Sequence, residues 1–316
     1  MNAPRTRVQR RPVHGLLLLD KPLGLSSNNA LQKAKYLLRA EKAGHTGTLD
    51  PLASGVLPLC FGAATKFSQI HLDADKTYEA LALMGQTTTT GDAEGDLLVE
   101  KEVTFEHADL SRVALAFTGT MAQTPPMHSA LKKDGKALYE YARQGVQVER
   151  SARTVVIRSL RLEEVQSHLG HRCVRMVVTC SKGTYIRTLA EDIGAALGCG
   201  AHLIALRRIR SGPFEAADCV SIEQLEAMDE GQRQAQLRPV DALLHDHHPI
   251  SLSPHESGRF LSGLRRRGDW SDCEHVAVYG QQPHALLGTA HVKAGELIPT
   301  RLLSPLEIKS LMEKPA

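Results

Sequence analysis

The chain has 316 residues, with 38 Lys or Arg against 35 Asp or Glu, which gives a formal net charge of +3 at pH 7. Hydrophobic residues make up 42% of it, an ordinary share for a soluble globular protein. The apolar run over residues 16–19 is too short for a signal peptide, and no run approaches the length of a membrane span. We therefore expect a cytoplasmic protein without membrane association, folded as one large domain or as a large and a small one.

Six cysteines are scattered along the chain without a Cys-x-x-Cys pair. This spacing argues against both a structural zinc site and a secreted disulfide framework, so we expect no metal. The run His245-Asp246-His247-His248 contains residue types that bind metals, but no further residues with zinc-site spacing accompany it.

Charge is distributed unevenly. Residues 1–66 contain ten Lys or Arg and three Asp or Glu, a net of +7, whereas residues 67–110 contain two against ten, a net of −8. Basic clusters follow later, and together they favour a polyanionic partner, although each alone is also compatible with a solvated surface. The clusters are Lys132-Lys133-Lys136, Arg150-Arg153-Arg158-Arg161, Arg207-Arg208-Arg210 and Arg265-Arg266-Arg267.

The N-terminal third alternates short strands and helices. Residues 1–12 are polar and carry four arginines, which predicts a disordered basic arm. Ser26 or Ser27 can cap a helix that runs to about Arg39, because apolar residues recur on one face of it. Strands are expected over 16–20 and 78–84, whereas the loop over 87–96 is too polar to belong to the core.

The middle of the chain contains a basic segment between two regular parts. A short helix is expected over 111–117, and a Pro-Pro pair ends it. We predict that the segment from about 124 to 152 is a mobile insertion, which contains a Lys-Asp-Gly turn followed by a helix. Strands over 153–165 and 172–180 alternate polar and apolar residues, which favours an antiparallel pair, and a helix is expected from Thr184 to Leu197.

The character of the sequence changes after about Leu244. We predict that residues 13–245 form an α/β or α+β domain with a mixed, largely antiparallel sheet flanked by helices. A small β-rich domain is expected over 250–316, with strands near 276–279 and 285–292. Neither a Gly-x-Gly-x-x-Gly motif nor a P-loop occurs, so enzymes with nucleotide cofactors are disfavoured.

The most informative stretch runs from Gly44 to Pro58. It holds three glycines, two prolines, one histidine and one carboxylate, Asp50, which is the only acidic residue between Glu41 and Asp73. Glycines allow close approach of the backbone, and prolines stiffen a loop. A carboxylate held in such a loop can attack an anomeric carbon, as in retaining glycosidases. The alternative is a turn whose Asp only bonds its own backbone.

Three segments together resemble the bacterial tRNA pseudouridine-55 synthases: residues 44–66, Lys76-Thr77-Tyr78 and Gly183-Thr184-Tyr185-Ile186-Arg187. The resemblance covers nearly the whole chain, most firmly residues 16–206. It implies a pseudouridine-synthase fold and an enzyme that isomerises uridine 55 in the tRNA T-loop, as a monomer and without a guide RNA. Because this reaction only rearranges bonds, it implies no cofactor.

The resemblance also assigns catalytic roles. Asp50 matches the family's nucleophile, which acts on a uridine extruded from the RNA, and Arg187 matches an arginine that pairs with it. Tyr78 and Tyr185 match two active-site tyrosines, whose rings can stack on uracil. A phenol can also help to remove the C5 proton. From the residues alone, an exposed arginine and ordinary half-buried tyrosines remain alternatives.

Five further residues match substrate-binding positions of the family. His45 matches a histidine that lies against the RNA, where an imidazole can fill the stack left by the extruded base. Leu206 matches an apolar wall of the uracil pocket. Lys21 and Lys66 match basic positions near the active site, and Asp92 lies in the matched Thr-Gly-Asp-x-x-Gly loop. General structural roles remain alternatives for each.

The remaining expectations concern the contacts with RNA. The segment 250–316 matches the family weakly and is interpreted as a PUA-like RNA-binding domain. Because every matched catalytic residue precedes it, we expect catalysis on a minimal hairpin to survive its removal from about Pro249. The basic arm and the clusters at 132–136 and 207–210 are expected to contact phosphates.

Three other functions remain as alternatives. An RNA-binding protein that assists tRNA folding without chemistry would not need Asp50, Tyr78 and Arg187. A guide-RNA-dependent enzyme of the same superfamily is disfavoured by the short N-terminal arm and the lack of a long Lys-rich tail. A glycoside hydrolase is disfavoured because no second carboxylate lies in the loop of Asp50.

Overall fold

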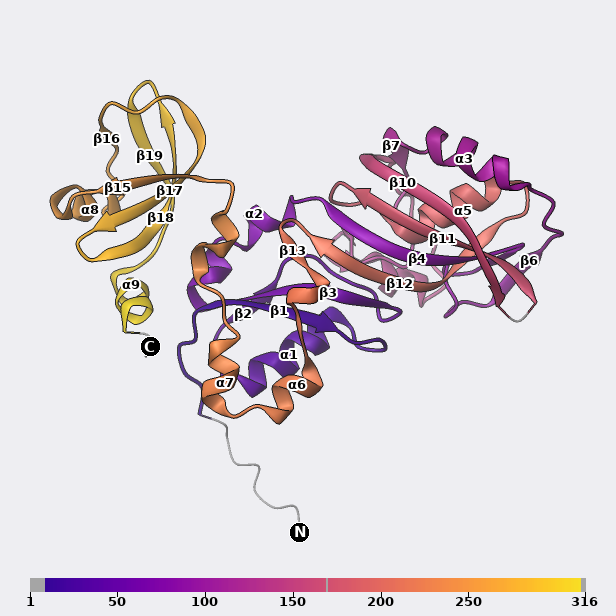
Figure 1. Cartoon of the computed structure of the whole chain (residues 1–316), viewed down its shortest axis with the longest axis horizontal. Helices are drawn as coiled ribbons and strands as arrows, with labels where there is room; N and C mark the ends of the chain where they lie inside the picture. The colour runs from indigo at the N-terminus through magenta and orange to yellow at the C-terminus, as the bar shows by residue number, and fades with distance from the viewer. Residues whose placement is uncertain (1–8, 169, 314–316) are drawn as a thin grey trace, which may run out of the picture.

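The computed structural model describes residues 9–168 and 170–313, and its main element is a mixed sheet of ten strands (Figure 1). The β1–β14 and β3–β12 pairs are parallel, and the other pairs are antiparallel, which confirms the predicted sheet type. In spatial order the strands are β14 (Val220–Ser221), β1 (Gly15–Lys21), β3 (Ala53–Phe61), β12 (Ala201–Ser211), β4 (Lys76–Met84), β11 (His171–Cys180), β10 (Arg153–His168) and β7 (Gly119–Gln123), with β2 (Ala43–His45) on β3 and β13 (Phe214–Glu215) on β12.

Helices and short 3-10 turns flank this sheet. Helix α1 begins after Ser26, whose side chain accepts a hydrogen bond from the backbone of Asn29, so the predicted cap is confirmed. Gly198, in the left-handed region at φ +85°, follows the end of α5 as predicted. The helices and turns are α1 (Ser27–Leu37), η1 (Gly62–Lys66), α2 (Ser68–Leu72), α3 (His107–Ala116), α5 (Ile186–Ala196), η2 (Ala216–Asp218), α6 (Ile222–Ala227), α7 (Glu230–Ala235) and η3 (Val240–Leu244).

Strand β1 explains the unbroken run of four leucines near the start of the chain. Leu17 and Leu19 belong to the apolar cluster under α1, whereas Leu16 and Leu18 belong to a second cluster on the opposite face. Successive side chains of a strand point to opposite faces, so a strand that is covered on both faces needs an apolar residue at every position. A third cluster joins the far half of the sheet to α3 and α5.

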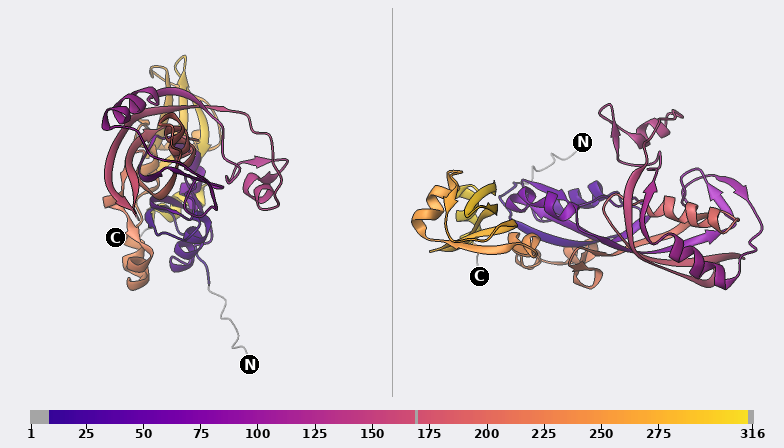
Figure 2. Two further views of the ribbon diagram at one scale, coloured as in Figure 1. Left: turned by 90° about the vertical axis from the view of Figure 1, so that its right-hand side faces the viewer. Right: turned by 90° about the horizontal axis from the view of Figure 1, so that it is seen from above.

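Two small hairpins extend from the sheet. Residues 124–152, between β7 and β10, form a segment that projects from the body, on the face opposite to the one in Figure 1 (Figure 2). Its chain reverses at Asp134 and Gly135, both in the left-handed region, which is the geometry of a two-residue hairpin turn. The elements of the two hairpins are β5 (Gln86–Thr88), β6 (Leu97–Glu100), β8 (Lys132–Lys133) and β9 (Lys136–Ala137), followed by α4 (Leu138–Ala142).

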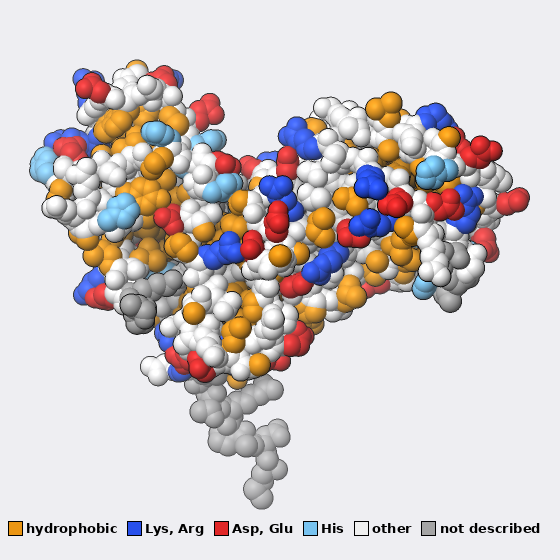
Figure 3. Space-filling model, viewed as in Figure 1, with side chains coloured by type: hydrophobic (Ala, Val, Ile, Leu, Met, Phe, Trp, Pro, Cys, Tyr) orange, Lys and Arg blue, Asp and Glu red, His pale blue; other side chains and the backbone are white. Residues whose placement is uncertain are grey.

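The C-terminal part contains a separate five-stranded sheet, which lies at the upper left of Figure 1. Its own core surrounds Phe260, which is fully buried. Figure 3 shows a broad notch between this part and the main sheet. In spatial order its strands are β15 (His248–Leu252), β17 (Cys273–Gln281), β18 (His284–Lys293), β19 (Glu296–Leu302) and β16 (Arg266–Arg267), accompanied by α8 (Pro254–Leu261) and α9 (Pro305–Met312).

The junction of the two parts is a continuous core. Leu18 of the main sheet and Leu286 of the C-terminal sheet belong to one cluster of buried side chains. The Tyr279 hydroxyl donates to Asp241 Oδ2 at 3.1 Å across the same junction. Removal of the residues after Pro249 would therefore expose apolar side chains of the main domain to water. This shared core counts against the expectation that catalysis on a minimal hairpin survives that removal.

Part of the predicted N-terminal arm is ordered. Residues 1–8 lie outside the described residues. The backbone of Arg11 pairs with that of Arg39 and Glu41, and the Arg11 side chain forms an ion pair with Glu230. These contacts fix residue 11 against the main domain, so the prediction of disorder up to residue 12 is wrong for this position. Among the helices of the described ranges, none combines the length and the apolarity that crossing a bilayer requires.

We expect Leu286→Ala to destabilise the whole chain in a single transition, by about 2–5 kcal/mol, because it leaves a cavity in the shared core. Scanning calorimetry measures this, with Leu264→Ala as the control, since Leu264 is half exposed in the same part of the chain. Two separate unfolding transitions, of which Leu286→Ala lowers the temperature of only one, would show that the two parts unfold independently.

Candidate active site

The loop that carries Asp50 is fixed at both ends. The Thr46 amide donates to Pro58 O at 3.1 Å, and the Ala53 amide donates to Asp50 O at 3.0 Å. Between them, the backbone N–H of Leu49 donates to the buried Ser27 Oγ at 2.7 Å, and that hydroxyl lies 2.9 Å from Leu49 O. The first residue of α1 thus anchors the residue before Asp50. A lone serine gives no sequence signal for such a contact.

Arg187 holds the Asp50 carboxylate. Arginine Nη2 lies 2.8 Å from Asp50 Oδ2, and the Arg187 side chain is 5% exposed whereas that of Asp50 is 40% exposed. The same guanidinium donates to Thr90 O at 2.9 Å and to His128 O at 2.7 Å. An arginine fork with this many partners has one orientation, so it aims the carboxylate while leaving one side of it accessible.

Asp92 completes the surroundings of Arg187, at 3.4 Å from Nη1. It was predicted to lie in a loop too polar for the core, and this prediction is wrong: Asp92 and Thr88 are both buried. The loop tolerates burial because its polar groups are paired. Thr90 Oγ1 donates to Asp92 Oδ1 at 2.5 Å, and Thr88 Oγ1 donates to Asp92 O at 2.7 Å.

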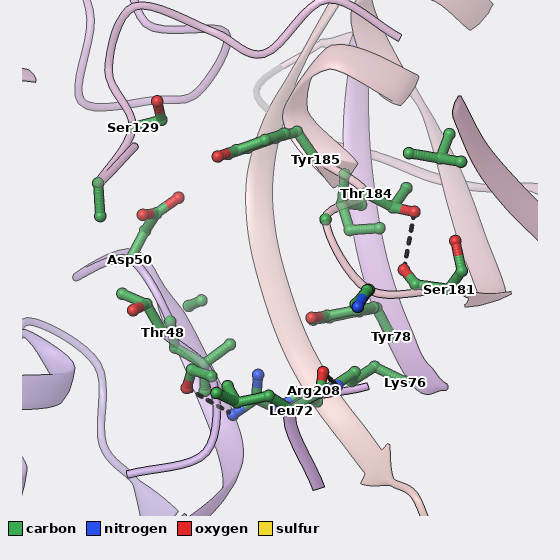
Figure 4. A pocket seen from close by; sticks show the side chains of 18 of the residues that line it. Thr48, Asp50, Leu72, Lys76, Tyr78, Ser129, Ser181, Thr184, Tyr185 and Arg208 are labelled. Atoms are coloured by element: carbon green, nitrogen blue, oxygen red, sulfur yellow. Dashed lines mark hydrogen bonds between the residues drawn. The ribbon is translucent and has the colours of Figure 1, made fainter. Parts of the chain in front are cut away.

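Two tyrosines face the same pocket. Tyr78 comes from β4 and Tyr185 from the residue that precedes α5, and Figure 4 shows both hydroxyls pointing towards the loop of Asp50. The buried Gln123 side chain fixes Tyr185, because it accepts from the Tyr185 amide at 2.8 Å and donates to the Tyr185 carbonyl at 3.1 Å. Burial raises the pKa of both hydroxyls.

The pocket has a volume of about 720 Å³, within the range of sites that enclose small molecules. It brings together six of the residues predicted from sequence: His45, Asp50, Tyr78, Tyr185, Arg187 and Leu206. In the described part of the chain, the buried His45 Nδ1 has no hydrogen-bond partner, and burial lowers the pKa of this imidazole. It is therefore neutral at pH 7.

Three predicted residues do not line the pocket. Asp92 does not reach the pocket itself but contacts Arg187, which does. Lys21 is buried, and its Nζ donates to Pro22 O at 2.9 Å and to Leu25 O at 2.6 Å; burial lowers its pKa to about 8, against the attraction of Asp50. Lys66 lies at the junction with the C-terminal part, 2.6 Å from Glu307, so its expected place near the active site is not supported.

The basic run at 207–210 also needs correction. Arg210 is exposed. Arg207 is partly exposed but forms a bidentate ion pair with Asp20, at 3.0 and 2.7 Å, and Arg208 is 1% exposed and lines the pocket. Alternation along a strand was the signal that could have found Arg208, because it lies two residues after Leu206 on the same face of β12. Among the described residues, no three His, Cys, Asp or Glu side chains are placed to hold a metal ion.

The buried Lys76 at the pocket predicts a specific pH dependence. Its Nζ donates to Leu72 O at 2.7 Å, and burial, followed by the charge of Arg208, lowers its pKa from 10.5 to about 8. Below pH 8 the folded protein bears the full cost of burying this charge. Between pH 8 and 10.5 the folded state releases the proton before the unfolded chain does, so the contribution of Lys76 to stability rises with pH.

We therefore expect the stability of the parent chain to rise relative to Lys76→Met by about 3 kcal/mol between pH 7 and 10.5, since one pKa unit corresponds to about 1.4 kcal/mol. Urea unfolding at a series of pH values measures this difference, with Lys182→Met, at an exposed lysine, as the control. A difference that does not change with pH would show that Lys76 keeps its charge when buried.

Comparisons with known proteins identify the family. Residues 35–186 match the TruB family pseudouridylate synthase N-terminal domain, and residues 187–245 match the tRNA pseudouridylate synthase B C-terminal domain. The fold is similar to one in the crystal structure of a Cbf5-Nop10-Gar1 complex, with a TM-score of 0.67 and 26% identity over 93% of this chain and 86% of that one.

Curated relatives are similar over nearly their full length. The tRNA pseudouridine synthase B of Verminephrobacter eiseniae is 62% identical over 98% of this chain and 95% of the relative. That of Cupriavidus metallidurans is 57% identical over 94% of this chain and 96% of the relative. The chain therefore belongs to the TruB family of tRNA pseudouridine synthases, which are isomerases.

Proposed function

We propose that this enzyme isomerises uridine 55 in the T-loop of tRNA, with Asp50 as the nucleophile and without a guide RNA. The observation that carries the proposal is the Asp50–Arg187 pair at a pocket whose other walls include two tyrosines and an apolar side chain. A planar base can stack between aromatic and apolar side chains, and a carboxylate beside it can form a transient bond with the nucleoside.

The reaction requires no external reactant. The bond between uracil N1 and ribose C1′ breaks, the freed ring turns, and C5 then bonds to C1′. The C5 proton leaves, its bonding electrons restore the ring double bond, and N1 takes up one proton. In this scheme Asp50 stabilises the separated fragments by its transient bond. Tyr78 lies in the same pocket, and its oxygen accepts the C5 proton after the hydroxyl has lost its own proton to water.

Contacts outside the pocket would hold the RNA. The projecting segment 124–152 carries the exposed Lys132 and Lys133 and lies on the face opposite to the one in Figure 3. On the face that Figure 3 shows, acidic and basic side chains are interspersed. We propose that this segment and the C-terminal sheet grip the T-arm, the latter as a PUA-like RNA-binding domain. The face in Figure 3, without a continuous basic surface, is less suited to phosphates.

Asp50→Asn tests the nucleophile. The amide has nearly the shape of the carboxylate but is not an anionic nucleophile, so tRNA binding should persist while tritium release from C5-labelled uridine falls by about 10³-fold or more. The assay uses the purified chain and a T-arm hairpin, which also tests independence from a guide. Asp75→Asn is the control, since Asp75 is an exposed partner of Arg158. Substantial release by Asp50→Asn would overturn the proposal.

His45→Ala tests extrusion of the base. If the imidazole fills the vacated stack, the substitution should slow the reaction of a folded T-arm about tenfold more than that of a short unstructured strand, because only the folded substrate must be unstacked. Single-turnover rates on the two substrates measure this ratio. An equal loss on both would limit His45 to a role in packing the pocket.

A further inference from the structure

Arg208 is a buried cation to which the proposed reaction assigns no role. Its Nε donates to Val56 O at 2.7 Å, and its Nη2 to Gly47 O at 3.4 Å. In the ranges that the structure describes, Arg207 next to it is paired with a carboxylate, whereas none lies within ion-pair distance of Arg208. A guanidinium buried against carbonyls, with no carboxylate at ion-pair distance among the described residues, keeps a positive charge that no anion neutralises.

The sheet places this charge beside Tyr78. Arg208 and Tyr78 are directly opposite each other in the antiparallel β12–β4 pair, and Figure 4 shows the two side chains next to each other in the pocket. Burial raises the pKa of the Tyr78 hydroxyl. The positive charge of Arg208, and the capacity of its side chain to donate a hydrogen bond to the hydroxyl, oppose this rise. Cys180 from β11 and Asp50 also act on this hydroxyl, and both raise its pKa.

The position of Arg208 is rigid. On its other side it pairs with Gly55 of β3, which has φ +102°. A Cβ at Gly55 would lie 2.2 Å from Arg208 O, so only glycine permits the two strands to approach this closely. The contact of Nη2 with Gly47 O connects the guanidinium to the loop of Asp50 as well. The cation therefore lies between the loop of the proposed nucleophile and the phenol.

We propose that Arg208 is the positioning residue of Tyr78: it holds the hydroxyl in the pocket and stabilises its ionised form in the step that removes the C5 proton. This inference rests on the proposed function. The Tyr78 oxygen, ionised by loss of its proton to water, accepts the proton from C5, and the C5–H electrons restore the C5–C6 double bond. Water then takes the proton from the phenol, and N1 is protonated by solvent.

A double-mutant cycle tests this role. Arg208→Met, Tyr78→Phe and the double variant are compared by single-turnover tritium release at saturating enzyme, so that binding does not contribute. We expect Arg208→Met to slow release at least about tenfold when Tyr78 is present and by less than about threefold in the Tyr78→Phe background. Arg208→Lys, which keeps the charge, should recover part of the rate, and Arg208→Met should shift the pH profile of release upwards.

Three controls separate this role from structure and from the proposed function. Arg112→Met removes an exposed cation of α3, outside the clusters that are expected to contact RNA, and should leave the rate unchanged. Should Arg208→Met fail to fold, as judged by its unfolding temperature, the cycle is run with Arg208→Lys. If Arg208→Met slows tritium release equally with and without the Tyr78 hydroxyl, the positioning role is overturned. Tritium release by Asp50→Asn would instead overturn the proposed function, whatever the result of the double-mutant cycle.

Discussion

The site depends on one buried guanidinium. Arg187 is almost completely excluded from water, so its charge and donors must be satisfied by protein groups. They are satisfied by Asp50, by Asp92, and by the carbonyls of Thr90 and His128. These four partners come from three chain segments, which the arginine brings to one place. The loop that carries Asp50, the acidic loop at 87–96 and the start of the projecting segment are thus positioned by a single side chain.

The same constraint explains why Asp50 is suited to act on a ligand. Two of the partners, Thr90 O and His128 O, are neutral, and Asp92 has its own hydroxyl donor in Thr90. Asp50 is the more exposed of the two carboxylates on Arg187, so it is the one that a ligand in the pocket can reach. An ion pair with one buried and one accessible member holds the accessible carboxylate in one orientation before the substrate arrives.

Motifs predicted much of this site, and pairing between distant strands explains most of what they missed. The sequence around Asp50, Tyr78 and Arg187 is distinctive locally, and these side chains do meet in one pocket. Alternation along β12 places Arg208 on the same face as Leu206, but its burial also depends on the parallel pairing of β12 with β3, which no local pattern reveals. Likewise an apolar pattern shows that a face is covered but not by what, so the core shared with the C-terminal sheet, where Lys66 lies, was not foreseen.

The most direct test of this account is a crystal structure of the enzyme with a T-arm hairpin. We expect a uridine that is extruded from the loop and bound between Tyr78 and Leu206, with the Asp50 carboxylate facing its glycosidic bond and Arg187 still paired with Asp50. A uridine that remains stacked in the hairpin, or that lies in the pocket while Asp50 turns away from it, would contradict the account.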